Sequence, residues 1–141
     1  MNPTARRLMW HGMFLFLLGL VTGFAETSFA NMRMGVAAHL EGVMNGIFLL
    51  ALGAAWPAVK LKPGANAAAF WLAMVGTYGN WLFTTLAAVW NTAALSPTLG
   101  PAHPAQPWQE HTVTIGFLAV GLAILATALL TLWGLRANAS A

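Results

Sequence analysis

A histidine, a glutamate and an asparagine interrupt one of the most apolar stretches of this chain, residues 36–52 (VAAHLEGVMNGIFLLAL). They are His39, Glu41 and Asn45. A charged side chain at the centre of a membrane helix costs about 2.5–3.5 kcal/mol on insertion scales, so such groups persist where they face a protein interior. An imidazole can ligate a metal, and a carboxyl group beside an amide can orient a substrate or carry a proton. This stretch is therefore the first candidate for a functional site.

Helical periodicity places these groups on two neighbouring faces. At 100° per residue, His39 shares a face with Gly42 and Gly46, while Glu41 and Asn45 share a second face. A glycine groove beside a histidine admits either a flat ligand or another helix backbone. Helix packing alone would explain the glycines, but it would not require His, Glu and Asn as well. The pattern therefore favours a ligand on His39, with Gly42 and Gly46 beside it.

A second polar position lies in the stretch GTYGNW at residues 76–81. Gly76, Asn80 and Thr84 are four residues apart and share one helical face. An asparagine in hydrocarbon needs hydrogen-bond partners, each worth about 0.6–2 kcal/mol between helices. Asn80 can serve as structural glue, or it can face Asn45 and form a shared polar pocket. Tyr78, the only tyrosine, is expected to point in another direction.

Composition identifies the class of protein that positions these residues. The chain has 141 residues, of which 59% are hydrophobic and only 6% are charged, against about 25% in soluble domains. The absence of cysteine excludes disulfides, thiolate nucleophiles, iron–sulfur clusters and thiolate-ligated haem. The sequence predicts an all-α integral membrane protein, a four-transmembrane-helix bundle forming one domain over residues 1–141. The expected spans are residues 8–24, 36–55, 67–89 and 113–135.

The basic residues predict the orientation. With both termini in the cytoplasm, five basic residues fall inside and only Arg33 falls outside, which fits a multi-pass protein of the cell inner membrane. The charges therefore report topology and not nucleic-acid binding. The proline-rich loop at residues 91–111 holds His103, Glu110 and His111, whose spacing fits no standard metal motif.

The order and spacing of these residues resemble the hydroxylaminobenzene mutases and, more distantly, the styrene oxide isomerases. The resemblance covers essentially the whole chain, and its most discriminating parts are the His and Asn-Gly of the second span and the Asn of the third. The residues that carry it are His11-Gly12, Gly19-Leu20, Gly23, Ala38-His39, Met44-Asn45-Gly46, Pro57 and Gly79-Asn80-Trp81.

The resemblance implies an isomerase that converts hydroxylaminobenzene (N-hydroxyaniline) to 2-aminophenol by intramolecular hydroxyl transfer, a reaction of nitroaromatic degradation. The related styrene oxide isomerases bind haem b between the subunits of a homotrimer and use its iron as a Lewis acid. By this resemblance His39 is the axial ligand of the haem iron, and Asn45 and Asn80 line the substrate pocket.

The remaining site residues follow from the same hypothesis. Asn45 and Asn80 orient the N–H and O–H groups of the substrate, and Glu41 carries the ring proton. Tyr78, Trp81 and Thr84 are expected in the pocket that receives the aromatic ring. The resemblance also has departures, because this chain has Gly76 where the epoxide isomerases carry an acid and Thr84 where they carry a tyrosine. We therefore expect poor use of epoxides.

Two other classes of function remain open from the sequence. The first is a membrane haem subunit for electron transfer, in which His39 and a second histidine, His11 or His111, ligate iron from both sides. His11 is expected near the inner surface, at a different depth from His39, which disfavours that pair. The second is a small transporter or assembly protein without a cofactor. A styrene-oxide-isomerase-like epoxide isomerase is a further alternative within the family.

Overall fold

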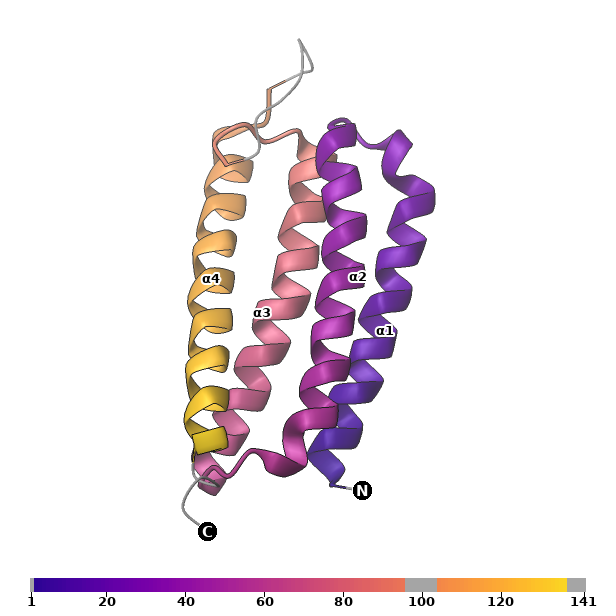
Figure 1. Cartoon of the computed structure of the whole chain (residues 1–141). Helices are drawn as coiled ribbons and strands as arrows, with labels where there is room; N and C mark the ends of the chain where they lie inside the picture. The colour runs from indigo at the N-terminus through magenta and orange to yellow at the C-terminus, as the bar shows by residue number, and fades with distance from the viewer. Residues whose placement is uncertain (1, 96–103, 137–141) are drawn as a thin grey trace.

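The computed structural model describes residues 2–95 and 104–136, and most of these residues form long helices (Figure 1). His103 lies outside the described residues. The all-α, four-helix architecture predicted from the sequence is confirmed. The helices are α1 (Pro3–Ala25), α2 (Met32–Ala55), α3 (Pro63–Trp90) and α4 (Pro107–Arg136), with 3-10 turns at Glu26–Ser28 and Trp56–Ala58.

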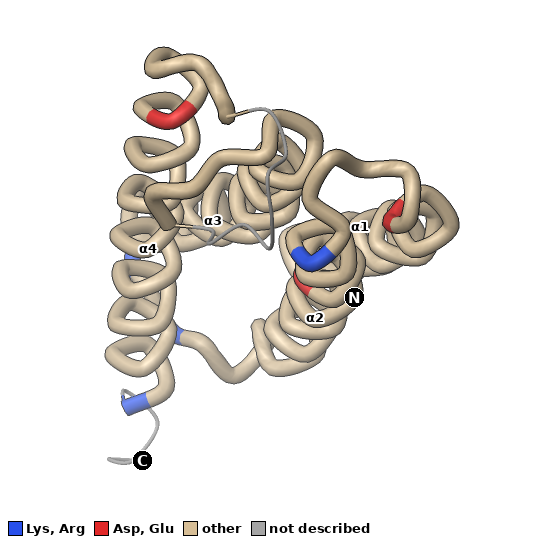
Figure 2. Tube along the Cα trace, turned by 90° about the horizontal axis from the view of Figure 1, so that it is seen from above, with Lys and Arg blue, Asp and Glu red and all other residues tan. Residues whose placement is uncertain are grey.

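The helices pack in chain order as a row. α1 packs on α2, α2 on α3 and α3 on α4. Seen along and across the helix axes, α1 and α4 lie at the two ends of this row (Figures 1 and 2). Figure 2 also shows how few charged positions the chain carries. The described ends of α1 and α4 lie at the same end of the bundle (Figure 1), as an even number of antiparallel helices requires.

Local sequence signals explain where the helices begin and end. Pro3, Pro63 and Pro107 each stand at the first position of a helix, where the missing N–H costs nothing. The Asn31 side chain accepts a hydrogen bond from Met34 N at 3.2 Å and so caps α2. Asn91 caps the C-terminus of α3, and its φ of 56° is the left-handed conformation typical of such a position.

Glycines set the close approach of α1 to α2. A Cβ at Gly46 would lie 2.6 Å from Phe16 N, and one at Gly12 would lie 2.8 Å from Gly46 O. One turn further on, Gly19 and Gly42 meet backbone to backbone. Small residues at such spacing let membrane helices gain van der Waals contact over their full length. The α1–α2 pair is therefore a rigid platform for the groups that α2 carries.

Three helices are long and apolar enough to cross a membrane, namely the segments Pro3–Ser28, Met32–Ala58 and Pro107–Arg136. α3, with 28 residues, has the length to cross but lies outside this set, although the sequence predicts a span at residues 67–89. Its polar side chains explain the difference. The hydroxyls of Thr77 and Thr84 donate to the carbonyls of Ala73 and Asn80 on the same helix, which lowers the cost of placing them in an apolar interior.

Candidate active site

His39 is held in one orientation by α1. Its Nδ1 lies 2.8 Å from the backbone oxygen of Gly19, and a carbonyl can only accept, so Nδ1–H is the donor. In this tautomer the lone pair that can bind a metal lies on Nε2. Histidines that ligate metals are oriented in the same way, with the second nitrogen bonded to a carbonyl or carboxylate. His39 therefore has the tautomer and the support that a metal ligand requires.

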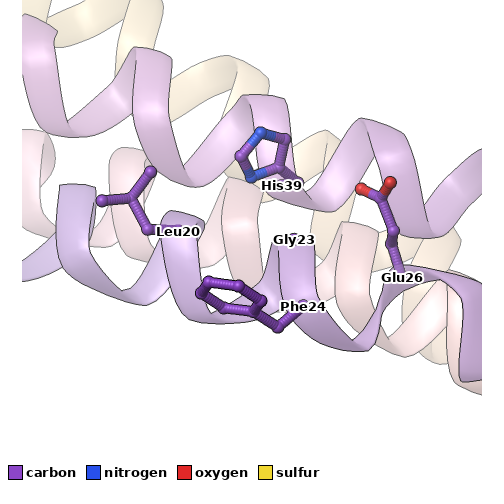
Figure 3. Close-up of a pocket in the computed structure, with 5 residues that line it drawn as sticks. All are labelled: Leu20, Gly23, Phe24, Glu26 and His39. Carbon is purple, nitrogen blue, oxygen red and sulfur yellow. The ribbon is translucent and has the colours of Figure 1, made fainter.

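The His39 ring borders a hollow of about 350 Å³ between α1 and α2, called the His39 hollow below. Figure 3 shows the ring over Gly23, with Leu20 and Phe24 along α1 and Glu26 at its end. A Cβ at Gly23 would lie 2.7 Å from His39 Nδ1, so the ring can lie in this position only beside a glycine. The walls are mainly apolar, and Phe24 is 91% exposed.

These residues fit a haem b group. The hollow offers Nε2 of His39, which would hold the iron, and apolar side chains against which a porphyrin would pack. Within residues 2–95 and 104–136, no group of three or more His, Cys, Asp or Glu is placed to hold a bare metal ion.

No second histidine lines the His39 hollow among the described residues. His11 lies elsewhere, where its Nδ1 is 3.0 Å from the Tyr78 hydroxyl of α3. His111 is exposed on the first turns of α4, which lies at the other end of the row of helices. One chain thus does not place either residue opposite His39, as a bis-histidine haem would require.

Glu41, Asn45 and Asn80 meet between α2 and α3. The amide of Asn80 donates to Oε2 of Glu41, and the amide of Asn45 donates to the same oxygen at 3.0 Å. Asn45 also donates to the Glu41 backbone oxygen at 2.8 Å. We call these three residues the carboxylate–amide cluster. The proximity of Asn45 and Asn80 expected from the sequence is present, and Glu41 joins them.

The His39 hollow and the carboxylate–amide cluster lie on different sides of α2. His39 turns toward α1, where Gly19 and Gly23 meet its ring, whereas Glu41 turns toward Asn80 of α3. The buried stripe of α2 that contains Gly42 runs between them. A single chain therefore presents the candidate ligand and the candidate acid–base group to different surroundings.

The groove expected beside Gly42 and Gly46 is filled by α1. Gly42 meets Gly19 and the Trp81 ring, and Gly46 meets Phe16 and the Gly12 carbonyl. The two glycines are thus helix-packing residues, which was the alternative the sequence left open. No space for a flat cofactor remains over them, because the absence of side chains has drawn the two backbones together.

The residues expected around the aromatic substrate all have partners within the bundle. The Tyr78 hydroxyl bonds His11, and the Trp81 indole N–H donates to the Thr22 hydroxyl at 3.0 Å. Thr84 is buried and donates to Asn80 O at 2.7 Å. None of the three lines the His39 hollow. Trp81 lies near the carboxylate–amide cluster by its place next to Asn80 in the sequence.

The sequence reasoning did not assign Gly19, Gly23, Leu20, Phe24 or Glu26 to the site. Gly19 and Gly23 are recognisable from sequence only as a helix-contact pair four residues apart. Their role depends on the register of the α1–α2 hairpin, which places Gly23 against His39 once Gly19 lies against Gly42. A short connection between two antiparallel helices is the signal from which this register could have been inferred.

Comparisons with known proteins find relatives over nearly the whole chain. The family model described as styrene oxide isomerase matches residues 4–136. The hydroxylaminobenzene mutase HabB of Ectopseudomonas oleovorans is 47% identical over 135 residues, which cover 95% of this chain and 82% of that protein. The hydroxylaminobenzene mutase HabA of the same organism is 42% identical over 125 residues, covering 88% of this chain and 93% of that protein. No solved structure matches the chain.

Proposed function

Because the chain belongs to the styrene oxide isomerase family, we propose that it is a membrane-bound isomerase that converts N-hydroxyaniline to 2-aminophenol. The observation that carries this proposal is the 47% identity to a hydroxylaminobenzene mutase over 95% of the chain. The reaction is an isomerisation without net redox change. The N–O bond breaks, a C–O bond forms at the ortho carbon, and the proton lost from that carbon is balanced by one gained on nitrogen.

We further propose that His39 holds haem b through Nε2. The support is the Nδ1–H bond to Gly19 O, together with the apolar hollow that Gly23 keeps open beside the ring. When bound, haem supplies a Lewis-acidic iron that stabilises negative charge on the departing oxygen. The protein contributes ligation, orientation and a site from which bulk water is excluded.

The carboxylate–amide cluster is proposed to manage the proton. Rearomatisation of the ring requires a base that accepts the ortho proton, and a carboxylate is the natural acceptor in a pocket without other anions. Asn45 and Asn80 both donate to Oε2 of Glu41, which leaves Oε1 for proton transfer. The same amides can turn toward the N–H and O–H groups of a bound arylhydroxylamine.

A homotrimer explains how groups on different sides of α2 can act together. One chain turns His39 toward the outer side of α1 and Glu41 toward α3, so one chain does not bring them to one point. In a homo-oligomer, the carboxylate–amide cluster of one protomer can complete the His39 hollow of the next. The exposed apolar side chain of Phe24, which borders the His39 hollow, suits such a contact as well as it suits lipid.

The proposed location is the cell inner membrane, with both termini in the cytoplasm. The described ends of α1 and α4 lie at one end of the bundle, and that end carries five of the six Lys and Arg residues, the exception being Arg33. The absence of cysteine makes this testable directly. Single cysteines at Ser28 and at Gly64, reacted with a membrane-impermeant maleimide in intact cells, should be labelled at Ser28 and protected at Gly64.

The function is tested with purified protein and N-hydroxyaniline in isotopically labelled water. We expect 2-aminophenol as the main product, carrying little label, because the hydroxyl is transferred within the molecule. The absorption spectrum should show a Soret band that changes when substrate is added. A protein that forms no 2-aminophenol contradicts the proposed reaction. A low-spin spectrum insensitive to substrate would instead favour electron transfer.

A further inference from the structure

α1 carries a pocket and a groove on its exposed surface that the proposed reaction does not use. Arg6, Arg7 and Trp10 line a pocket of about 360 Å³ at the inner end of the bundle, called the basic pocket below. Arg6 and Arg7 are exposed, and Trp10 is 61% exposed. Trp10 also opens an apolar groove of about 400 Å³ that runs along α1. The groove is lined by Trp10, Met13, Phe14, Phe16, Leu17 and Leu20.

We infer that the basic pocket and the groove together bind one anionic phospholipid, with its phosphate between Arg6 and Arg7 and an acyl chain along the groove. This inference rests on the membrane placement proposed above. A phosphate oxygen is the acceptor that guanidinium groups match best, through paired N–H donors. A groove lined only by apolar side chains is what an acyl chain requires, and the two spaces meet at Trp10.

Among residues 2–95 and 104–136, no acidic side chain pairs with the two guanidinium groups. The chain has three acidic residues in all, Glu26, Glu41 and Glu110. Glu26 lies at the outer end of α1, Glu41 bonds Asn80, and Glu110 accepts from the backbone N–H groups of Ala93 and Ala94. None of these positions is near the first turns of α1. That helix end also has no acidic residue to offset the positive end of its own dipole.

Contacts within the protein hold two side chains of the basic pocket, Arg7 and Trp10, in place. The Arg7 guanidinium carbon lies 4.6 Å from the centre of the Phe70 ring of α3, which limits the freedom of a long side chain. Trp10 stacks on Phe14, with ring centres 5.3 Å apart and an angle of 15° between the planes. Tryptophan prefers the level of lipid head groups, so Trp10 marks the boundary between the charged and the apolar part.

The same end of the bundle offers a matched control. Lys60 and Lys62, with Leu61, Ala65 and Trp133, line a pocket of about 210 Å³ next to the α2–α3 connection, and this pocket shares no residue with the groove along α1. Replacing both lysines changes the net charge by the same amount as replacing both arginines. General attraction of a basic surface to anionic lipid would be weakened equally by the two changes.

The test is competition between phosphatidylglycerol and phosphatidylcholine with identical acyl chains, followed by native mass spectrometry of the full chain released from mixed micelles. We expect the unchanged protein to retain phosphatidylglycerol with about 30-fold preference, the ratio that corresponds to two basic residues at about 1 kcal/mol each. Arg6→Gln with Arg7→Gln should abolish the preference, whereas Lys60→Gln with Lys62→Gln should preserve it. Equal loss in both double variants, or no preference in the unchanged protein, would overturn the inference.

Two further measurements keep the result interpretable. Leu17→Trp, which fills the groove but leaves both arginines, should weaken retention of both lipids without changing their ratio. Excess inorganic phosphate should not displace phosphatidylglycerol, and complete displacement would mean a free-anion site instead of a lipid site. Cysteine labelling at Ser28 and Gly64 reports the membrane placement separately, so its failure is distinguishable from failure of the lipid site.

Discussion

The His39 ring lies so close to Gly23 that a Cβ at residue 23 would come within 2.7 Å of Nδ1 and 3.1 Å of Cε1. Gly23→Ala should therefore rotate the imidazole away from Gly19 O and lower both haem retention and turnover. The measurement is the ratio of Soret to protein absorbance, with the rate of 2-aminophenol formation. Gly121→Ala is the matched control, because nothing lies within 4 Å of its added Cβ. Full haem occupancy in Gly23→Ala would contradict this role for Gly23.

His39 itself should be indispensable for the spectrum. His39→Ala removes the Nε2 donor, so we expect loss of the Soret band and of mutase activity together. His111→Ala, an exposed position on α4, should keep both. Activity in a haem-free His39→Ala protein would end the Lewis-acid hypothesis. Loss of the spectrum in His111→Ala would instead support ligation by two histidines.

The carboxylate–amide cluster should couple stability to catalysis. Asn80→Ala removes one of the two donors to Glu41 Oε2, and we expect a stability loss of about 0.6–2 kcal/mol. A double-mutant cycle with Glu41→Gln, followed by denaturation in mixed micelles, measures the pairwise term. Thr85→Val is the control, since that hydroxyl bonds only Trp81 O on its own helix. Additive losses would show that the two side chains do not interact.

Glu41→Gln separates the two roles assigned to that residue. The amide retains an oxygen that can accept from Asn45 and Asn80 but cannot take up the ring proton. We expect the variant to fold and bind haem, with kcat lowered about 100-fold or more while KM changes little. The readouts are steady-state kinetics and the Soret band. Unchanged kcat would assign the proton step to another group or to water.

The contact of Gly42 with Gly19 should be the most sensitive point of the α1–α2 pair. A methyl group at Gly42 would meet the Gly19 backbone and force the helices apart, and overpacking of this kind costs about 1–3 kcal/mol. Thermal unfolding of Gly42→Ala should therefore begin at a lower temperature than that of Gly64→Ala, where the added Cβ has open space. A melting temperature equal to that control would contradict the assigned packing.

The sequence predicted the helices well because each is marked by strong local signals. The expected second span, residues 36–55, shares its last residue with α2, and α3 exceeds its expected range, residues 67–89, by four residues at its start and one at its end. The largest difference is at α4, which begins at Pro107, although residues up to 111 were expected in the loop. Proline favours the first helical position, and the polar turn that follows can extend a helix beyond hydrocarbon.

The candidate site could be predicted only in part. Pairing of polar groups in an apolar interior is a strong requirement, so the sequence brought Asn45 and Asn80 together correctly. Which side chains of two neighbouring helices meet depends on how each helix is rotated about its own axis. Hydropathy does not fix this rotation when several faces of a helix are apolar. That is why Tyr78 was expected beside the substrate, although its hydroxyl lies against His11.

The polarity of α3 has a consequence for how the protein is made. α3 is not among the three helices that are long and apolar enough to cross a membrane. Such a helix enters lipid readily only when neighbouring helices shield its polar groups. Glu41 of α2 reaches Asn80, and Ile124 of α4 covers Gly76, so both neighbours contribute to that shielding. Integration of α3 by the translocon is thus expected to depend on the helices synthesised before and after it, and truncation before α4 should leave α3 on the wrong side of the bilayer.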